Sequence, residues 1–234
     1  MIKGALFDLD GTLVDSIGCY RLAFSGGMRY FGIEPLDLSR VMALLDRGAR
    51  IQDILAALLP SLDETMLATL RNKIVEIYIA LEKEHIRLLP GAIDLLSNLK
   101  SRGLRTGVAT SRVARGDGKW RDLQRFGLDA FIDVVVTAAD FRPKPAPDTI
   151  VECVRQLGLV ASECVYVGDS TCDIIAAREA GLVACAVTTG VGQKSALMAA
   201  GPIVVVDSLL ELIPWFESIS HAPGRQANQG LLPP

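Results

Sequence analysis

The sequence predicts an α/β fold, with a mostly parallel sheet covered by helices on both faces and an inserted all-helical domain. Short, nearly continuous apolar runs, typical of strands buried on both faces, alternate with helical patterns that end at glycine. Residues 16–88 interrupt this alternation and contain only helical patterns. Strand–helix alternation indicates parallel strands joined by helical crossovers, so the interruption is interpreted as an insertion.

The expected strands of the sheet begin with the apolar run at residues 2–9. The others are residues 104–110, 132–137, 164–169, 182–188 and 202–207. Helical patterns lie between them and end at Gly103, Gly158 and Gly181, where glycine supplies the left-handed backbone that stops a helix. We assign the sheet and its helices to a core domain made of residues 1–15 and 89–218.

Residues 16–88 are predicted to form a cap domain, with helices near 16–31, 37–46, 50–59 and 63–84. The last of these has apolar residues at spacings of three and four, and Asp63 can cap its start. Hinges are expected near residues 14–16 and 88–90. The tail, residues 219–234, lacks periodicity and is expected to be disordered.

The overall charge excludes some partners. The chain has 234 residues and a formal net charge of −3, with basic residues scattered along it. This balance gives no electrostatic argument for binding nucleic acid or an anionic membrane. The N-terminus turns acidic too early for a signal peptide, and no apolar run is long enough to span a membrane. We expect a soluble, cytoplasmic monomer or homodimer that acts on a small molecule.

The supply of reactive side chains also limits the chemistry. The five cysteines are odd in number and form no CxxC pair, which favours reduced thiols over a disulfide framework. Only two histidines are present, too few to favour a histidine metal site or a Ser-His-Asp triad. We therefore expect chemistry based on carboxylates and lysine.

The stretch "FDLDGTLVDS" places Asp8 and Asp10 directly after the first strand. Their side chains leave the same side if strand geometry persists, at the strand end where open α/β sheets bind ligands. Two adjacent carboxylates need a cation or a shared proton, and Mg²⁺ prefers oxygen ligands. A solvated polar turn is the alternative. An EF-hand is excluded because Leu13 stands where its loop needs glycine.

Other polar residues follow other predicted strands. "GVATSR" ends in Thr110 and Ser111, "CVYVGDSTCD" delivers Asp169 and Asp173, and "FRPKPAPD" holds Lys144 between prolines. Each alone has a structural explanation, such as a helix cap or a surface lysine. Their ordered occurrence at or just after strand carboxyl ends is much less expected by chance, and it favours one shared ligand site.

Four motifs, "DLDGT", "VATS", "KPAPD" and "GDSTCD", resemble in order and spacing those of the haloacid-dehalogenase-like (HAD) hydrolase superfamily. The sequence is similar to its phosphoglycolate-phosphatase-like and β-phosphoglucomutase-like branch, with a C1-type helical cap after the first motif. The resemblance covers about residues 1–216. It implies a Rossmann-like core and a Mg²⁺-dependent phosphatase that hydrolyses a small phosphorylated metabolite through an aspartyl-phosphate.

The resemblance also implies roles for the aspartates. A carboxylate is ionised at neutral pH, so Asp8 can attack phosphorus without a base. Mg²⁺ would be held by Asp8, the backbone carbonyl of Asp10, Asp169 and, directly or through water, Asp173. Asp10 would protonate the leaving group and activate water, which requires a pKa raised by a neighbouring carboxylate and partial burial.

Further residues would bind the phosphoryl group. Thr110 and backbone NH groups near Ser111 and Gly11 would donate hydrogen bonds to it, and Lys144 would neutralise Asp8 and the transition state. In the cap, "LLDRGARIQ" presents Arg47 and Arg50, which could offer a cation to an acidic substrate. Arg112, close to Thr110, is a further specificity candidate, although all three arginines are also explained as solvated surface residues.

Two other functions remain open. A phosphomutase of the same fold would use the same motifs and return the phosphoryl group to the sugar. A non-catalytic phosphate-binding module is disfavoured because Asp8, Asp10, Lys144 and Asp169 are all present. Dehalogenase and phosphonatase activities are disfavoured because the members of the superfamily with those activities lack an aspartate at the position of Asp10.

Overall fold

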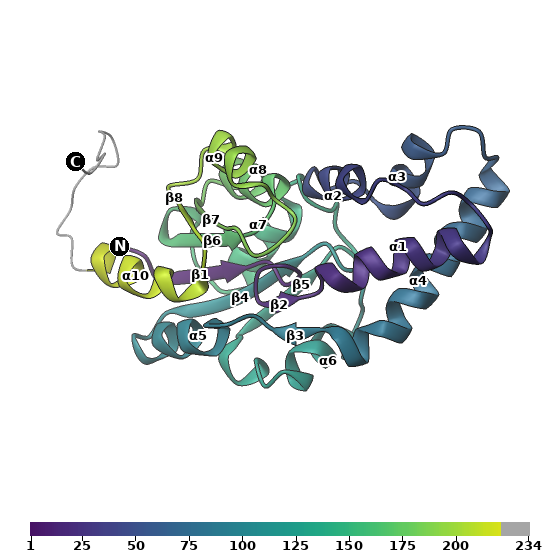
Figure 1. Cartoon of the computed structure of the whole chain (residues 1–234). Coiled ribbons are helices and arrows are strands. Elements are labelled where there is room, and N and C mark those ends of the chain that lie inside the picture. Colours follow the sequence, from purple (N-terminus) through teal and green to yellow (C-terminus); the bar gives the residue numbers. More distant parts are fainter. Residues whose placement is uncertain (221–234) are drawn as a thin grey trace.

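A computed structural model describes residues 1–220 and contains a six-stranded sheet that separates two layers of helices (Figure 1). The strand order is β5-β4-β1-β6-β7-β8, and every neighbouring pair is parallel. The strands are β1 (Gly4–Phe7), β4 (Arg105–Thr110), β5 (Val134–Thr137), β6 (Cys164–Gly168), β7 (Val183–Val187) and β8 (Val204–Val206). The predicted α/β fold is confirmed.

Side chains of β1 alternate between two apolar cores, as strand geometry requires. Ala5 and Phe7 face one core and Leu6 the other, and all three are fully buried. The first core is covered by α5 (Ala92–Ser101), α6 (Gly118–Arg125) and α10 (Leu212–Ser220). The second is covered by α7 (Asp148–Gln156), α8 (Thr171–Glu179) and α9 (Lys194–Ala200). Short 3₁₀ turns occur at Asp129–Phe131, Ala161–Glu163 and Leu209–Glu211.

Four helices lie beyond the end of the sheet, and we call them the cap (Figure 1). They are α1 (Ile17–Tyr30), α2 (Leu38–Asp46), α3 (Ile51–Leu58) and α4 (Glu64–His85). They enclose an apolar core of their own. Helices α1 and α4 pack closely because Gly27 has no side chain; a Cβ there would lie 2.5 Å from Ile74. Asp63 caps α4 as predicted, by accepting a hydrogen bond from the NH of Met66 at 2.8 Å.

The chain enters and leaves the cap through a two-stranded antiparallel ribbon. Its strands, β2 (Val14–Asp15) and β3 (Arg87–Leu88), pair side by side at the positions where hinges were expected. The ribbon was not predicted, because two residues are too short to show a period.

The sheet topology determines where side chains can converge. Strand β1 lies between β4 and β6, and the chain proceeds outward from it to β5 on one side and to β8 on the other. A crevice forms at the carboxyl ends of strands where such an order reverses. Residues that follow β1, β4 and β6 therefore meet at one edge.

Several boundaries differ from the predictions. The first strand ends at Phe7, because the chain then turns and the NH groups of Leu13 and Val14 both donate to the carbonyl of Leu9. Helices α6, α9 and α10 were missed. Residues 219 and 220 of the expected disordered tail belong to α10, whose Phe216 is buried against the sheet. Residues 221–234 lie outside the described part.

Two further expectations can be compared with the structure. All five cysteines are free and buried, in agreement with the expectation of reduced thiols. Within residues 1–220, no helix combines the length and the apolar character that crossing a membrane requires.

Neighbouring isoleucines of α8 test the packing of the sheet. Ile174 is fully buried and Ile175 is 41% exposed. We expect Ile174→Ala to lower the free energy of unfolding by about 2–5 kcal/mol, because it leaves a cavity in the core. Ile175→Ala is the matched control and should cost less than about 1 kcal/mol. Urea unfolding measures both, and equal losses would contradict the packing.

Candidate active site

Asp8 follows the last residue of β1 and lines a cavity between the sheet and the cap. Its backbone NH donates to the carbonyl of Val167 on β6 at 2.9 Å, so the residue stays fixed to the sheet after β1 has ended. The residue is only 6% exposed. Its carboxylate accepts a hydrogen bond from Lys144 Nζ at 2.5 Å.

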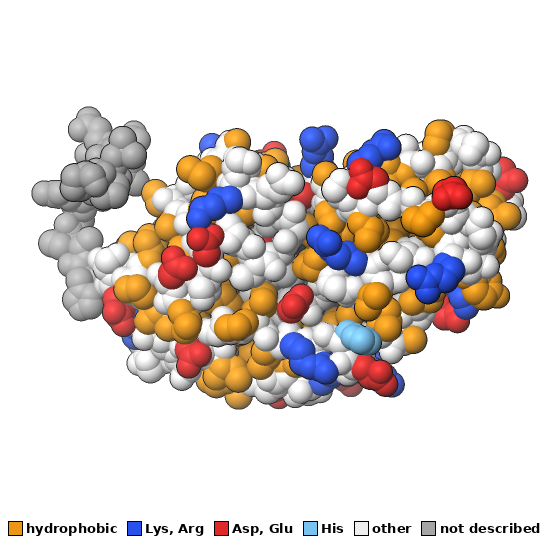
Figure 2. Space-filling model, in the orientation of Figure 1, with side chains coloured by type: hydrophobic (Ala, Val, Ile, Leu, Met, Phe, Trp, Pro, Cys, Tyr) orange, Lys and Arg blue, Asp and Glu red, His pale blue; other side chains and the backbone are white. Residues whose placement is uncertain are grey.

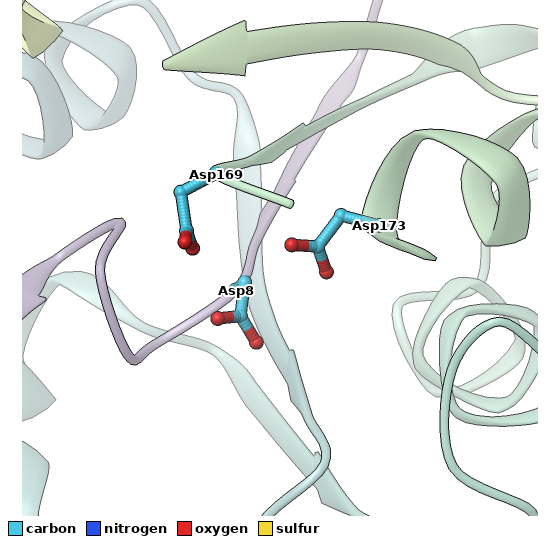
Figure 3. A group of neighbouring side chains, drawn as sticks. All are labelled: Asp8, Asp169 and Asp173. Atoms are coloured by element: carbon cyan, nitrogen blue, oxygen red, sulfur yellow. The ribbon is translucent and has the colours of Figure 1, made fainter. Parts of the chain in front are cut away.

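Asp169 and Asp173 point toward Asp8 from the end of β6 and the start of α8 (Figure 3). One carboxylate oxygen from each of the three lies within 4.8 Å of the others, and all three residues are buried. Ser170 is the N-cap residue of α8 and fixes Asp173 through a reciprocal cap, in which the NH of Ser170 donates to the Asp173 carboxylate at 3.1 Å. The local sequence "GDSTCD" thus directs both acids into the site.

The turn after β1 supports Asp169. The hydroxyl of Thr12 and the NH of Val191 each donate to its carboxylate at 2.9 Å. Gly11 and Gly190 allow the close approach, since a Cβ on Gly11 would lie 2.6 Å from an oxygen of Asp169 and one on Gly190 would overlap the same carboxylate. These contacts hold Asp169 beside Asp8, but none of the groups that make them is positively charged.

Lys144 is the cation of this group and is only 3% exposed. Its Nζ donates to Asp8 and Asp173, each at 2.5 Å, and to the hydroxyl of Tyr166 at 2.8 Å. The prolines on both sides keep its loop out of a helix. The ammonium therefore bridges two of the three carboxylates.

Burial dominates the electrostatics of these acids. It raises the pKa of Asp8 to about 7, against the opposing effect of Lys144 and with added repulsion from Asp173. Burial, together with the charges of Asp173 and Asp8, also raises the pKa of Asp169 well above its usual range. For Lys144 burial favours the neutral amine, but the negative charges of Asp173 and Asp8 outweigh it and raise the pKa well above its ordinary value. Without a further cation, the site retains protons near neutral pH.

The donor set fits a hard divalent cation. Three buried carboxylates share one ammonium, so the group carries an excess of negative charge when fully ionised. Oxygen donors of this kind are what Mg²⁺ and Ca²⁺ bind in proteins. A bound dication would compensate the charge and favour the ionised forms.

Asp10 has other partners than the acidic group. The Arg112 guanidinium binds both of its oxygens, at 2.6 and 2.7 Å. The same arginine donates to Glu82 at 3.0 Å and to the hydroxyl of Tyr78 at 3.2 Å, both on α4 of the cap. The ion pair corrects one expectation: burial favours a higher pKa, but Arg112 outweighs it and lowers the pKa of Asp10. Arg112, the further specificity candidate, lines the cavity and is paired with two carboxylates.

The expected phosphate-binding residues divide into two groups. Thr110 ends β4 and lines the cavity together with Ser111. The hydroxyl of Thr110 accepts a hydrogen bond from the NH of Arg112 at 3.2 Å and can still donate its proton. The NH of Gly11 itself donates to the carbonyl of Val14 at 2.8 Å, so in this conformation that NH is already paired.

The cavity has a volume of about 720 Å³, and the cap contributes much of its wall. Arg50 lines it, as do Arg71 and Asn72 of α4, which the sequence analysis did not select. Arg47 is exposed and does not line the cavity in this conformation, so its role in specificity stays a prediction.

The loop between α2 and α3 rests on the core directly beside Lys144. The Asp46 carboxylate accepts a hydrogen bond from the NH of Thr171 at 2.7 Å, and the Asp46 carbonyl accepts one from the Thr171 hydroxyl at 2.9 Å. Gly48 has a φ of +81°, and a side chain there would overlap the carbonyl oxygen of Lys144. The cap therefore covers the acidic group in this conformation.

Comparison with known proteins places the chain in a family. Residues 5–187 match the model of the haloacid dehalogenase-like hydrolases. The chain belongs to this family. The resemblance predicted from the four motifs is thereby confirmed.

Named relatives agree with the assignment to the haloacid dehalogenase-like hydrolases. The chain is 37% identical over 183 residues to hexitol phosphatase A of Escherichia coli, covering 76% of this chain and 80% of that protein. It is 30% identical over 212 residues to a phosphoglycolate phosphatase of Synechococcus elongatus. That match covers 91% of this chain and 96% of that protein. The crystal structure of a hydrolase from Pseudomonas syringae superposes with a TM-score of 0.77 at 28% identity. The superposition covers 93% of this chain and 99% of that one. Like the two named phosphatases, the chain is a hydrolase of the phosphatase type.

The structure of this haloacid dehalogenase-like hydrolase adds supporting residues that the sequence analysis gave no role. Tyr166 places a hydroxyl beside Lys144, and its one sequence signal is a polar atom within the buried run "CVYVGD". Thr12 belongs to the first motif, but its contact with Asp169 depends on the turn that follows β1. Asp46 and Arg71 carry no local signal, because both depend on how the cap meets the core.

Tyr166 gives a test of this support. Its hydroxyl donates to the carbonyl of Ala109 at 2.8 Å while accepting from Lys144. We expect Tyr166→Phe to lower the free energy of unfolding by about 1–3 kcal/mol, since it leaves buried polar groups unpaired. Tyr30→Phe, at a residue that is 65% exposed, is the matched control. Urea unfolding compares them, and the contact has no structural importance if the two variants are equally stable.

Proposed function

We propose that this protein is a Mg²⁺-dependent phosphatase that hydrolyses a small phosphorylated metabolite through an aspartyl-phosphate at Asp8. One observation carries the proposal: Asp8 shares a buried group with Asp169, Asp173 and Lys144 at the edge of a cavity large enough for a small molecule. A metabolite of the phosphoglycolate or sugar phosphate type suits this volume.

Asp8 is the proposed nucleophile. An oxygen of its carboxylate attacks phosphorus, and the bond between phosphorus and the ester oxygen of the substrate breaks. Asp8, Asp169 and Asp173, with the backbone carbonyl of Asp10, would hold Mg²⁺. When bound, Mg²⁺ supplies compensation for the negative charge of the phosphoryl group and of the carboxylates.

Lys144, Thr110 and Ser111 are the proposed groups that bind and stabilise the transferred phosphoryl group. The ammonium of Lys144 already lies against Asp8, so it can neutralise charge that develops there during transfer. The Thr110 hydroxyl and backbone NH groups near Ser111 line the cavity and can donate hydrogen bonds to phosphoryl oxygens. Fixed donors of this kind need little reorganisation during the reaction.

Asp10 is the proposed acid and base. It protonates the departing alkoxide, then takes a proton from the water that attacks the phosphorus of the aspartyl-phosphate and releases phosphate. In the conformation described, both of its oxygens are bound by Arg112. Proton transfer therefore requires one oxygen to leave Arg112, and Asp10 is expected to change partners when substrate binds.

A phosphomutase would use the same groups, but the relatives carry phosphatase names, which favours transfer to water. We propose hydrolysis for this reason.

We expect Asp8→Asn to lower the turnover of para-nitrophenyl phosphate by at least about 1,000-fold, because the variant lacks the nucleophile. Asp15→Asn is the control, since Asp15 is an exposed aspartate of the nearby ribbon. The assay measures released inorganic phosphate. Near-normal release by Asp8→Asn would rule out the nucleophile.

We expect removal of divalent cations to abolish turnover, because the three carboxylates would then carry protons or repel the substrate. The measurement compares phosphate release before treatment with EDTA, after treatment, and after excess Mg²⁺ is added. Added Mg²⁺ should restore the rate in the wild-type protein but not in Asp169→Asn. Full activity in the presence of EDTA would contradict the metal dependence.

A further inference from the structure

Arg112 lies where the core meets the cap, and its acceptors come from both sides. It follows β4 of the sheet, whereas Tyr78 and Glu82 belong to α4 of the cap. Asp10 and Arg112 both line the cavity. The side chains of Asp10, Glu82 and Arg112 are mostly shielded from water, so the two ion pairs are screened less than pairs on the open surface.

The nitrogens of Arg112 divide between these partners in a specific way. Nε donates to Oδ2 of Asp10 at 2.6 Å, and Nη1 donates to the carboxylate of Glu82 at 3.0 Å. Nη2 is shared, because it donates to Oδ1 of Asp10 at 2.7 Å and to the hydroxyl of Tyr78 at 3.2 Å. In a guanidinium Nη2 carries two hydrogens and Nε carries one. The departure of Oδ1 would therefore leave Nη2 bound to Tyr78.

The acceptors on α4 are themselves fixed in place. Tyr78 packs against the apolar cores of both the sheet and the cap, and its ring centroid lies 4.7 Å from that of Tyr20. Arg125 of α6 donates to the backbone carbonyls of Glu82 and Lys83. The carbonyls of the last turn of a helix lack partners within it and attract a positive charge. This end of α4 is thus attached to the core as well as to the cap.

We propose that Tyr78 and Glu82 are positioning residues, which keep Arg112 on α4 while Oδ1 of Asp10 leaves it for the reaction. The proposal rests on the proposed function, because it takes Asp10 to be the acid and base. Oδ1 passes its proton to the alkoxide as the ester bond to phosphorus breaks, and it takes a proton back from the water that attacks the aspartyl-phosphate.

The two acceptors on α4 compete with Asp10 for the donors of Arg112. When one acceptor is removed, a donor of Arg112 is freed for Asp10, and a guanidinium that binds both oxygens of a carboxylate holds it firmly. Asp10 then stays paired, and the transfer of its proton slows. The binding of the phosphoryl group is unaffected, because neither Tyr78 nor Glu82 lines the cavity.

Substrates with different leaving groups test the proposal. An alkoxide needs a proton as it departs, whereas para-nitrophenolate is a stable anion that leaves without one. The value of kcat/KM reports the steps up to phosphoryl transfer from the substrate. We expect Glu82→Gln and Tyr78→Phe to lower kcat/KM for phosphoglycolate or glucitol 6-phosphate by about 10-fold, and for para-nitrophenyl phosphate by less than about 2-fold.

Matched variants separate positioning from a general loss of structure. Glu84→Gln changes an exposed glutamate of the same helix, and Tyr30→Phe changes an exposed tyrosine of the cap. Neither should change the ratio of kcat/KM between the alkyl and the aryl substrate. Equal losses on both kinds of substrate, or a ratio that the control variants change as much, would overturn the proposal. Thermal unfolding confirms that the variants are folded.

A crystal structure of full-length Asp10→Ala tests the holding of Arg112 without turnover, and Asp10→Ser serves if the first variant does not fold. We expect Nη1 and Nη2 of Arg112 to remain on Glu82 and Tyr78, since both acceptors are still present. This result supports the proposal even if no compound is hydrolysed, an outcome that would overturn the proposed function alone. An Arg112 side chain turned away from α4 overturns the proposal, whatever the turnover.

Discussion

The crowding of three buried carboxylates around one ammonium is the constraint on which the rest of the site depends. Asp8, Asp169 and Asp173 leave the ends of β1 and β6 and the start of α8. Among residues 1–220, Lys144 is the cation that pairs with this group, through Asp8 and Asp173. Such a group is stable when it is partly protonated or when it holds a further cation. In the proposed mechanism, a bound dication would compensate this imbalance while Asp8 attacks a phosphate ester.

The sheet produces this crowding, and the cap controls what reaches it. Parallel strands deliver Asp8 and Asp169 to one edge, while Gly11 and Gly190 let the chain pass close enough to hold Asp169 in place. The cap closes over this edge through the Asp46–Thr171 contact. Arg112 links the proposed acid and base to α4, so the position of the cap and the state of Asp10 are connected. Figure 2 shows that charged side chains of both signs are interspersed over the visible face of the described chain.

The sequence predicted the acids of the site better than their partners, for a physical reason. Asp8, Asp169 and Lys144 could be selected because parallel strands end at a common edge, and the cap helices showed a clear period. The pairing of Asp10 with Arg112 could not be predicted, because the two residues are far apart in sequence and a surface arginine has no local pattern that names its partner. In the sequence, Arg71 cannot be distinguished from a solvent-facing arginine of a helix, and only the structure shows that it lines the cavity.

The most direct test of the central constraint is the free energy of unfolding of the metal-free protein from pH 5 to 7.5, with and without Mg²⁺. Asp8 and Asp169 have raised pKa values in the folded state, so the folded protein binds more protons than the unfolded chain in this range. Stability should therefore fall as the pH rises, by about 1–4 kcal/mol, and Mg²⁺ should remove most of the fall. A stability that is level across this range and unchanged by Mg²⁺ would contradict the account.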